Sequence, residues 1–253
     1  MRSRFTLLLC LLPACAQAQQ APSVDELLPR LYAYAREYRA KLPSLSCDEA
    51  ITSQVLKNGN VKKELLVEAT LREVRDDSKT EPFTERRTFK TVDGRRPKPH
   101  FTIPFLVQGA FANAIGFVRE DREACFDYRL VAQDGGATLR LDMALKPNYT
   151  DSNCKDVPEG YKKTVLMDAK TFRITHVDRT ISAEAAKHSI EVYFFSTDFS
   201  PQKLGNETFW LPVKVYAHDA ADAGRMYATY SNFHRFAGEL KVLPMDAQPG
   251  EVR

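Results

Sequence analysis

The sequence predicts a mostly β fold of the α+β class, in which one long N-terminal helix precedes a large antiparallel sheet. Two observations lead to this prediction. Apolar residues recur every three or four positions over residues 23–42, and at every second position in most later segments. The later segments do not alternate with helical ones, so the βαβ units of a parallel sheet are not expected.

The N-terminal helix has clear start and stop signals. Ser23 and Glu26 have the spacing of a capping box, and Pro43 ends the helix after about five turns. Its apolar face is expected to contain Leu27, Leu31, Tyr34, Tyr38 and Leu42.

Strict alternation of apolar and polar residues indicates strands with one buried face and one solvated face. The clearest series is Ala137, Leu139, Leu141, Met143 and Leu145. Similar runs lie around residues 65–71, 126–130, 190–195, 209–217 and 226–236. Turns between them are expected at Asn58-Gly59, Asp93-Gly94 and Gly135-Gly136. We therefore expect about nine to eleven strands.

One apolar segment, residues 101–118, breaks this alternation, and we call it the insert. Pro104, Gly109 and Gly116 interrupt it, and residues 109–117 could form a short helix. The insert is either a plug that fills the open end of the sheet, a movable lid over an apolar cavity, or a patch for a protein partner. The candidate lid and cavity residues are Phe101, Ile103, Phe105, Phe111, Ile115, Phe117, Leu139, Leu141 and Met143.

Residues 1–18 have the features of an export signal. Arg2 and Arg4 precede a short apolar run, and Ala16-Gln17-Ala18 fits a cleavage site. The remainder is expected to be one domain, residues 19–236, with a loosely ordered tail at 237–253. A second interpretation stays open, because the sequence before Cys15 resembles a lipobox and a lipidated Cys15 would anchor the chain to a membrane. We expect a periplasmic or secreted protein, or such a lipoprotein.

The composition argues against two classes of protein. Without Arg2 and Arg4, 34 of the 36 lysines and arginines remain against 33 acidic residues, so no basic field favours nucleic acid. The insert is too polar and too interrupted for a bilayer helix, and no transmembrane span is expected.

Three cysteines follow the leader. An odd number in an exported protein suggests one disulfide and one free thiol. We favour a Cys125–Cys154 disulfide with Cys47 free, although the sequence allows all three pairings.

Catalytic and cofactor-binding signatures are not found in the sequence. The five histidines form no metal-binding pair, and there is no nucleophile elbow, dinucleotide fingerprint or Cys-x-x-Cys. A non-catalytic protein without metal or cofactor is expected. An enzyme whose residues converge only in the fold is a third alternative.

Two short motifs add to this layout: a hairpin of the form Asp168-x-x-Thr171-x-x-Ile174, and a strand that contains Phe209-Trp-Leu-Pro212. With the leader, helix, sheet and insert, residues 23–236 resemble the periplasmic lipoprotein-carrier superfamily, and above all uncharacterised secreted bacterial proteins of that pattern. The resemblance implies a strongly curved antiparallel sheet that forms an incomplete barrel, a short helical lid or plug, and binding of acyl chains without catalysis. The chain is longer than the carriers, and their lid-locking arginine is not identified in it.

Two functions therefore compete. The first is a binding protein that holds a lipid, an acyl chain or an acylated lipoprotein in an apolar cavity. The second is a structural domain of the cell envelope whose core is filled and which contacts protein partners. A filled core should not take up an apolar dye, whereas a cavity should.

Overall fold

The structure is a computed structural model that describes residues 22–79, 82–107, 111, 119–188, 193–221 and 223–236. The export leader, Cys15 and the tail from residue 237 lie outside these ranges. Within the described ranges, no helix combines the length and the apolar character that a membrane span requires.

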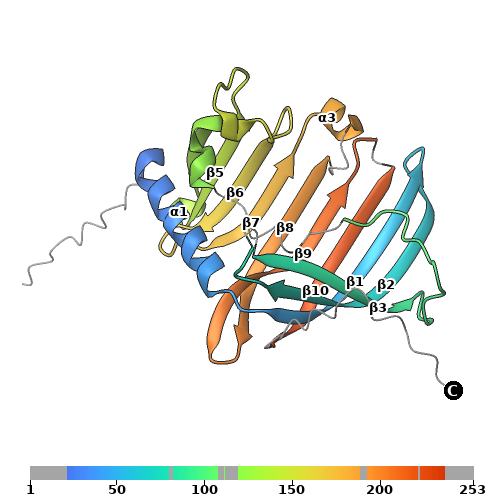
Figure 1. The fold of residues 1–253 in the computed structure, drawn as a ribbon. Coiled ribbons are helices and arrows are strands. Elements are labelled where there is room, and N and C mark those ends of the chain that lie inside the picture. The colour runs from blue at the N-terminus through green and yellow to red at the C-terminus, as the bar shows by residue number, and fades with distance from the viewer. Residues whose placement is uncertain are drawn as a thin grey trace, which may run out of the picture.

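The described strands form one antiparallel sheet of ten strands in the order β3-β2-β1-β10-β9-β8-β7-β6-β5-β4 (Figure 1). The sheet is not closed, because its edge strands β3 and β4 do not pair with each other. The predicted fold class, a mostly β incomplete barrel with few helices, is confirmed. The strands are β1 (Leu45–Lys57), β2 (Asn60–Arg75), β3 (Phe83–Val92), β4 (Phe126–Gln133), β5 (Thr138–Leu145), β6 (Lys162–Asp168), β7 (Ile174–Thr180), β8 (Phe194–Leu204), β9 (Glu207–His218) and β10 (Gly224–Arg235).

The connections explain how a chain with mostly local pairings builds one sheet. Strands β4 to β10 pair in sequence order, and β1 to β3 form a second series of hairpins. The antiparallel β1–β10 pair joins the two series and brings the two ends of the domain together. The helical elements are α1 (Val24–Lys41), α3 (Ala183–His188) and the short 3₁₀ segments η1 (Glu120–Cys125), η2 (Asp134–Gly136) and η3 (Ser152–Cys154).

Helix α1 begins and ends as the sequence predicts. The Ser23 hydroxyl accepts a hydrogen bond from the Glu26 amide, the Glu26 carboxylate accepts one from the Ser23 amide, and Leu42 is the C-cap. The buried face is rotated from the expected one, because Leu28 and Tyr32 are buried beside Leu27 and Leu31. Tyr34 and Tyr38, expected on this face, are only partly buried and pack at its margin.

The alternation in the strands places one apolar face on the inside of the curved sheet. In β2, Val67, Ala69 and Leu71 are buried, whereas Glu68 is exposed. In β5, Leu139, Leu141 and Met143 are buried in the same way, and Ala137 lies before the strand. The concave face is therefore the apolar side of the sheet.

Of the strand expected around residues 190–195, the structure describes the part from Tyr193 onward, and β8 includes Phe194 and Phe195. Helix α3 ends at His188, and β8 begins at Phe194. The residues between 189 and 192 lie outside the described ranges, as do residues 108–110 and 112–118 of the insert. The short helix predicted at 109–117 is therefore not tested.

The Asp168 turn between β6 and β7 explains the first of the two short motifs. The Asp168 carboxylate accepts hydrogen bonds from the Lys170 and Thr171 amides and from the Thr171 hydroxyl. An aspartate that binds its own turn in this way fixes the hairpin. The motif is thus a local turn, and its last residue, Ile174, is buried on the apolar face of the sheet.

The pairing between β9 and β10 is short. Five residue pairs join them, from Arg225–His218 to Thr229–Lys214, so that Glu207–Pro212 extends beyond the β10 pairing. The register of β8 and β9 shifts opposite Pro212. A proline cannot donate a ladder hydrogen bond, and this place, where β9 lacks its β10 neighbour, tolerates one. Trp210 lies in this part of β9, beyond the β10 pairing.

The Cys125–Cys154 disulfide is confirmed, and Cys47 is free and buried. Cys125 ends η1 immediately before β4, rather than lying inside a strand, and Cys154 ends η3. The bond therefore ties two short 3₁₀ segments together at the edge of the sheet.

Replacing both Cys125 and Cys154 by serine is expected to lower the free energy of unfolding by about 3–4 kcal/mol. The bond closes a loop with a sequence separation of 29 residues, and its loss frees the unfolded chain. Urea unfolding without reductant measures the change, and reduced wild-type protein should match the double variant. A loss below about 1 kcal/mol would show that the other contacts of η1 and η3 suffice.

Candidate functional site

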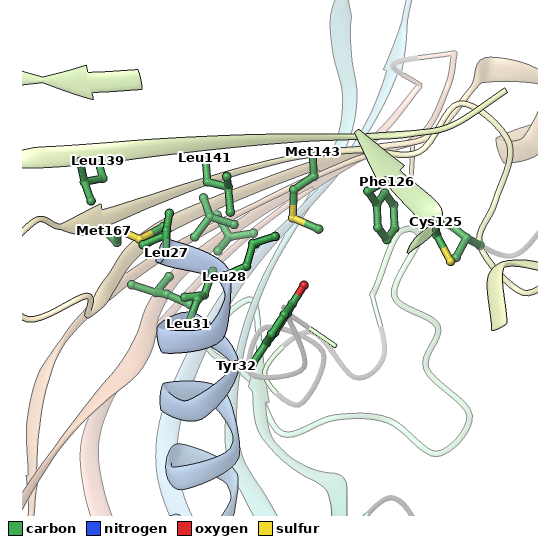
Figure 2. Packing of buried hydrophobic residues seen from close by; sticks show 14 of the residues in the cluster. Leu27, Leu28, Leu31, Tyr32, Cys125, Phe126, Leu139, Leu141, Met143 and Met167 are labelled. Atoms are coloured by element: carbon green, nitrogen blue, oxygen red, sulfur yellow. The ribbon is translucent and has the colours of Figure 1, made fainter. Parts of the chain in front are cut away.

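The concave face is covered first by α1. Leu27, Leu28 and Leu31 point from the helix toward Leu139 and Met167 on the sheet (Figure 2). This helix-covered cluster also contains Tyr32, Cys125, Phe126, Leu141, Met143, Cys154, Val157, Val165, Ile174, Val177 and Phe199. The packing of α1 on β4 to β7 makes this half of the concave face an ordinary core.

The second cover is the described part of the insert, residues 101–107 with Phe111. Phe111 is fully buried, and its ring meets those of Tyr230 and Phe233 at centroid distances of 5.4 and 6.3 Å. Ile103, Phe105, Leu106 and Val107 pack against the same cluster. This insert-covered cluster also contains Leu42, Leu45, Cys47, Ile51, Val67, Leu71, Phe195, Leu204, Phe209, Leu211, Val215, Ala217, Met226 and Ala228.

Side chains of the sheet anchor the insert. The Ser53 hydroxyl donates to the Phe105 carbonyl at 2.8 Å and accepts from the Phe105 amide at 3.0 Å. The Val107 amide donates to the Met226 sulfur at 3.4 Å. The Phe111 amide donates to the Glu85 carboxylate at 3.0 Å. None of these four bonds is a strand ladder, so the described part of the insert lies on the sheet without joining it.

The start of β10 is shaped to receive the insert. A Cβ atom at Gly224 would lie 2.6 Å from the Phe105 ring, closer than side chains approach. Glycine at this position therefore allows the Phe105 ring to lie directly on the backbone of the sheet.

A charged cluster lies beneath the insert at the β3 edge of the sheet. The Arg87 guanidinium contacts Glu49 through two nitrogens, at 2.7 and 3.0 Å, and Glu85 through a third at 2.7 Å. These three side chains are at most 5% exposed. We call Glu49, Glu73, Glu85 and Arg87 the buried charge cluster.

Glu73 is the unusual member of the buried charge cluster. It is fully buried, and neither carboxyl oxygen has a hydrogen-bond partner in the part of the chain that the structure describes. It lies directly opposite Glu85 in the β2–β3 register, where like charges repel. Burial, and then the charge of Glu85, raises the pKa of Glu73 to about 8, although Arg87 acts in the opposite direction. At neutral pH this carboxyl is therefore mostly protonated.

Two further buried groups adjoin the buried charge cluster. The Tyr230 hydroxyl is buried close to Glu49, its cross-strand neighbour. Burial, and then the charge of Glu49, raises the pKa of the Cys47 thiol well above its usual range. A thiol that stays protonated in this way is a poor nucleophile, so Cys47 does not have the properties of a catalytic cysteine.

The structure divides the predicted site residues between the two covers. Leu139, Leu141 and Met143 lie under α1 in the helix-covered cluster. Phe111 belongs to the insert-covered cluster, with Ile103 and Phe105 packed against it, and Phe101 stacks edge-on against Phe89 at 5.0 Å. Ile115 and Phe117 lie outside the described residues. The predicted lid and the predicted lining on β5 are thus not brought together.

Two hollows adjoin Phe126 at the start of β4, and the larger of them also reaches the N-terminal end of α1. One has a volume of about 70 Å³ and is lined by Arg119, Arg122, Phe126, Met143, Val157, Pro158, Tyr161 and Lys163. The other, about 520 Å³, is open to solvent beside Asp25, Glu120 and Glu123. Neither hollow is lined by the insert or by the buried charge cluster.

A separate polar group lies on the outer face of β7 and β8. His176 contacts Asp178 at 2.9 Å and Asp198 at 2.6 Å. The hydrogen bond to Asp178 raises the pKa of His176 to about 9, with Asp198 adding to it against the effect of burial. The imidazole is thus charged at neutral pH and serves as an ion-pair partner between two strands.

The fold and the candidate site together define an incomplete barrel whose concave apolar face is covered by a helix and an insert. Neither a protein-family model nor a curated protein sequence matches the chain.

Similar arrangements occur among solved structures. A DUF1329 family protein from Desulfovibrio piger is 12% identical, covers 84% of this chain and 94% of its own, and has a TM-score of 0.40. A LolA superfamily protein from Nitrosomonas europaea is 12% identical, covers 87% of this chain and 98% of its own, and has a TM-score of 0.42. A putative outer membrane lipoprotein-sorting protein domain from Vibrio parahaemolyticus is 10% identical, covers 85% of this chain and 95% of its own, and has a TM-score of 0.46. Two of these neighbours are described by the name of the carrier class that the sequence resembles, and at these identities the likeness concerns the fold alone.

Proposed function

We propose that this chain is an exported, non-catalytic binding protein that holds the acyl chain of a lipid or lipoprotein on its concave face, beneath the insert. The periplasm is the proposed place of action, because residues 1–18 have the features of an export signal. The acyl chain as cargo follows from the resemblance to lipoprotein carriers.

The observation that carries the proposal is the way in which the insert is attached. Residues 101–107 have no regular secondary structure, and side chains of Ser53, Met226 and Glu85 hold the insert on an apolar face. A segment with few backbone hydrogen bonds to the sheet opens at a lower free energy than a strand does. An acyl chain that replaced the insert would gain about 0.8 kcal/mol for each buried methylene.

A second candidate, a structural domain of the cell envelope, is favoured by a different observation. Phe111 and the side chains of α1 that face the sheet are completely or almost completely buried. In this alternative the insert is a permanent plug, and protein partners contact the edges of the sheet.

Mass spectrometry of the protein purified from its native envelope tests the proposed function. A lipid-sized adduct that is present under native conditions and lost on denaturation would support the proposal. A ligand-free native mass would favour the structural domain. The denatured mass also shows whether the chain begins after residue 18 or at an acylated Cys15.

Replacing Ser53 by alanine is expected to loosen the insert, because it removes both hydrogen bonds to Phe105. If the insert is a lid, we expect a several-fold increase in the fluorescence of an apolar dye, with a loss of about 1–2 kcal/mol of unfolding free energy. Ser46→Ala, on the same strand but facing outward, is the matched control. A loss of stability without dye uptake would identify a plug and contradict the proposal.

A further inference from the structure

The buried charge cluster lacks a partner for one of its carboxyl groups. Arg87 is surrounded by Glu49 and Glu85, and its fork of donors is divided between these two carboxylates. Glu73 lies within the influence of Glu85 and Arg87, and neither of its carboxyl oxygens has a hydrogen-bond partner among the described residues. If all three carboxyl groups were ionised, one guanidinium would face three negative charges.

Such an arrangement is costly in a core without a further donor. Buried polar groups are almost always hydrogen-bonded, and an unpartnered buried carboxyl is disfavoured by its lost hydration. A leucine at position 73 would continue the apolar series of Val67, Ala69 and Leu71 on the same face of β2. Among the described residues nothing supplies a donor to this carboxyl, and a bound ligand could supply one.

We propose that the buried charge cluster binds the primary ammonium group of an amphiphile whose acyl or alkyl chain lies in the insert-covered cluster. This inference rests on the proposed function and names the class of its ligand. A primary ammonium is compact and has three N–H donors, so it can donate hydrogen bonds to Glu73 and Glu85 together. A second, planar guanidinium beside Arg87 would need more space. The apolar residues around the buried charge cluster select the chain that accompanies the charge.

A metal ion is a poorer fit to the same residues. In the part of the chain that the structure describes, no group of histidine, cysteine, aspartate and glutamate side chains is arranged to hold one. The three carboxyl groups do not surround a common empty point, because Arg87 already occupies the space between Glu49 and Glu85.

The insert connects this site to ligand entry. The Phe111 amide donates to Glu85, and the Phe111 ring covers Tyr230. An arriving ammonium would replace the Phe111 amide as the donor to Glu85 and would supply the missing donor to Glu73. Binding of the head group and displacement of Phe111 therefore favour each other.

Proton release gives the site a second readout. The groups that act on Glu73 are Glu85 and Arg87 on β3, and Cys47 on β1 lies near enough to be affected by its charge. At pH 7 the Glu73 carboxyl is mostly protonated, because burial and Glu85 raise its pKa to about 8. A cation bound beside it favours the charged form, so up to one proton should leave as the ammonium enters.

The test compares ten-carbon probes, each below its micelle-forming concentration, by calorimetry at pH 7 in two buffers of different ionisation enthalpy. We expect decylammonium to bind at least tenfold more tightly than decanol or decanoate, and to release protons. Glu73→Gln should abolish both the preference and the proton release, whereas the outward-facing Glu68→Gln should leave both unchanged. Circular dichroism and a melting curve check that each variant is folded.

Three results would overturn the inference in distinguishable ways. Equal binding of decylammonium and decanol would leave the proposed function standing and remove the ammonium site. Equal binding of decylammonium and the short propylammonium would identify a site for chainless amines and contradict an amphiphile. If no ten-carbon probe binds, the proposed function fails, and the ammonium site fails with it.

Discussion

Replacing Arg87 by methionine is expected to lower the free energy of unfolding by about 5 kcal/mol, the largest effect of any single substitution considered for this protein. The arginine is the shared ion-pair partner of Glu49 and Glu85, and all three side chains are at most 5% exposed. Without it, two buried carboxylates lose their counter-charge, and one of them, Glu85, lies opposite Glu73. Urea unfolding measures the loss, which approaches the whole stability of many domains.

The same strand offers a matched control for Arg87. Arg86 is the next residue on β3 and is exposed, so Arg86→Met should change the unfolding free energy by less than about 0.5 kcal/mol. Combining Arg87→Met with Glu49→Leu and Glu85→Leu should recover most of the loss, because a buried ion pair replaced by apolar residues is often close to neutral. Equal stability of Arg86→Met and Arg87→Met would show that the ion pairs contribute nothing.

The second large effect is a fall in stability as the pH rises from 5 to 8. Glu73 binds its proton up to a pH of about 8 in the folded chain, but only up to its ordinary pKa of 4.5 in the unfolded chain. Between these values the folded state holds more protons, so each pH unit lowers the unfolding free energy by about 1.4 kcal/mol. The contribution of this one group over the whole window is about 5 kcal/mol.

The difference between wild type and Glu73→Gln isolates this contribution. His176 also holds its proton more tightly in the folded state, so its contribution to the unfolding free energy is lost as the pH rises from 6.5 toward 9. This His176 contribution is the same in wild type and in the variant, so it cancels in the difference. The variant should therefore show a flatter profile between pH 5 and 8. Parallel profiles for the two proteins would mean that Glu73 is already ionised when the protein is folded.

Much of the fold could be predicted from the sequence because its determinants are local. The Ser23 capping box, the alternation in β5 and the Asp168 turn each act within a few residues. The pairing of Cys125 with Cys154 was also correct, although the sequence could not exclude the other pairings. The strand order was not predicted, because the β1–β10 pair joins residues far apart in the chain.

The buried charge cluster was missed for a related reason. Glu49 lies between Cys47 and Ile51, and Glu73 follows Leu71, so both occupy inward positions of alternating strands. An acidic residue at an inward position of an alternating strand was therefore an indication, visible in the sequence, that the acid is buried. The ion pairs themselves depend on how β1, β2 and β3 align, and no feature of a single strand determines that register.

The short ladder between β9 and β10 has a mechanical consequence. Eleven residue pairs join β8 to β9 and ten join β1 to β10, but five join β9 to β10. The ladder between β7 and β8 also has five pairs, so short ladders join the β8–β9 hairpin to the rest of the sheet on both sides. The Tyr38 hydroxyl of α1 donates to the Trp210 carbonyl of this hairpin at 2.7 Å. A bound molecule of varying bulk would be accommodated by bending at these two short ladders, while the eleven pairs between β8 and β9 remain intact.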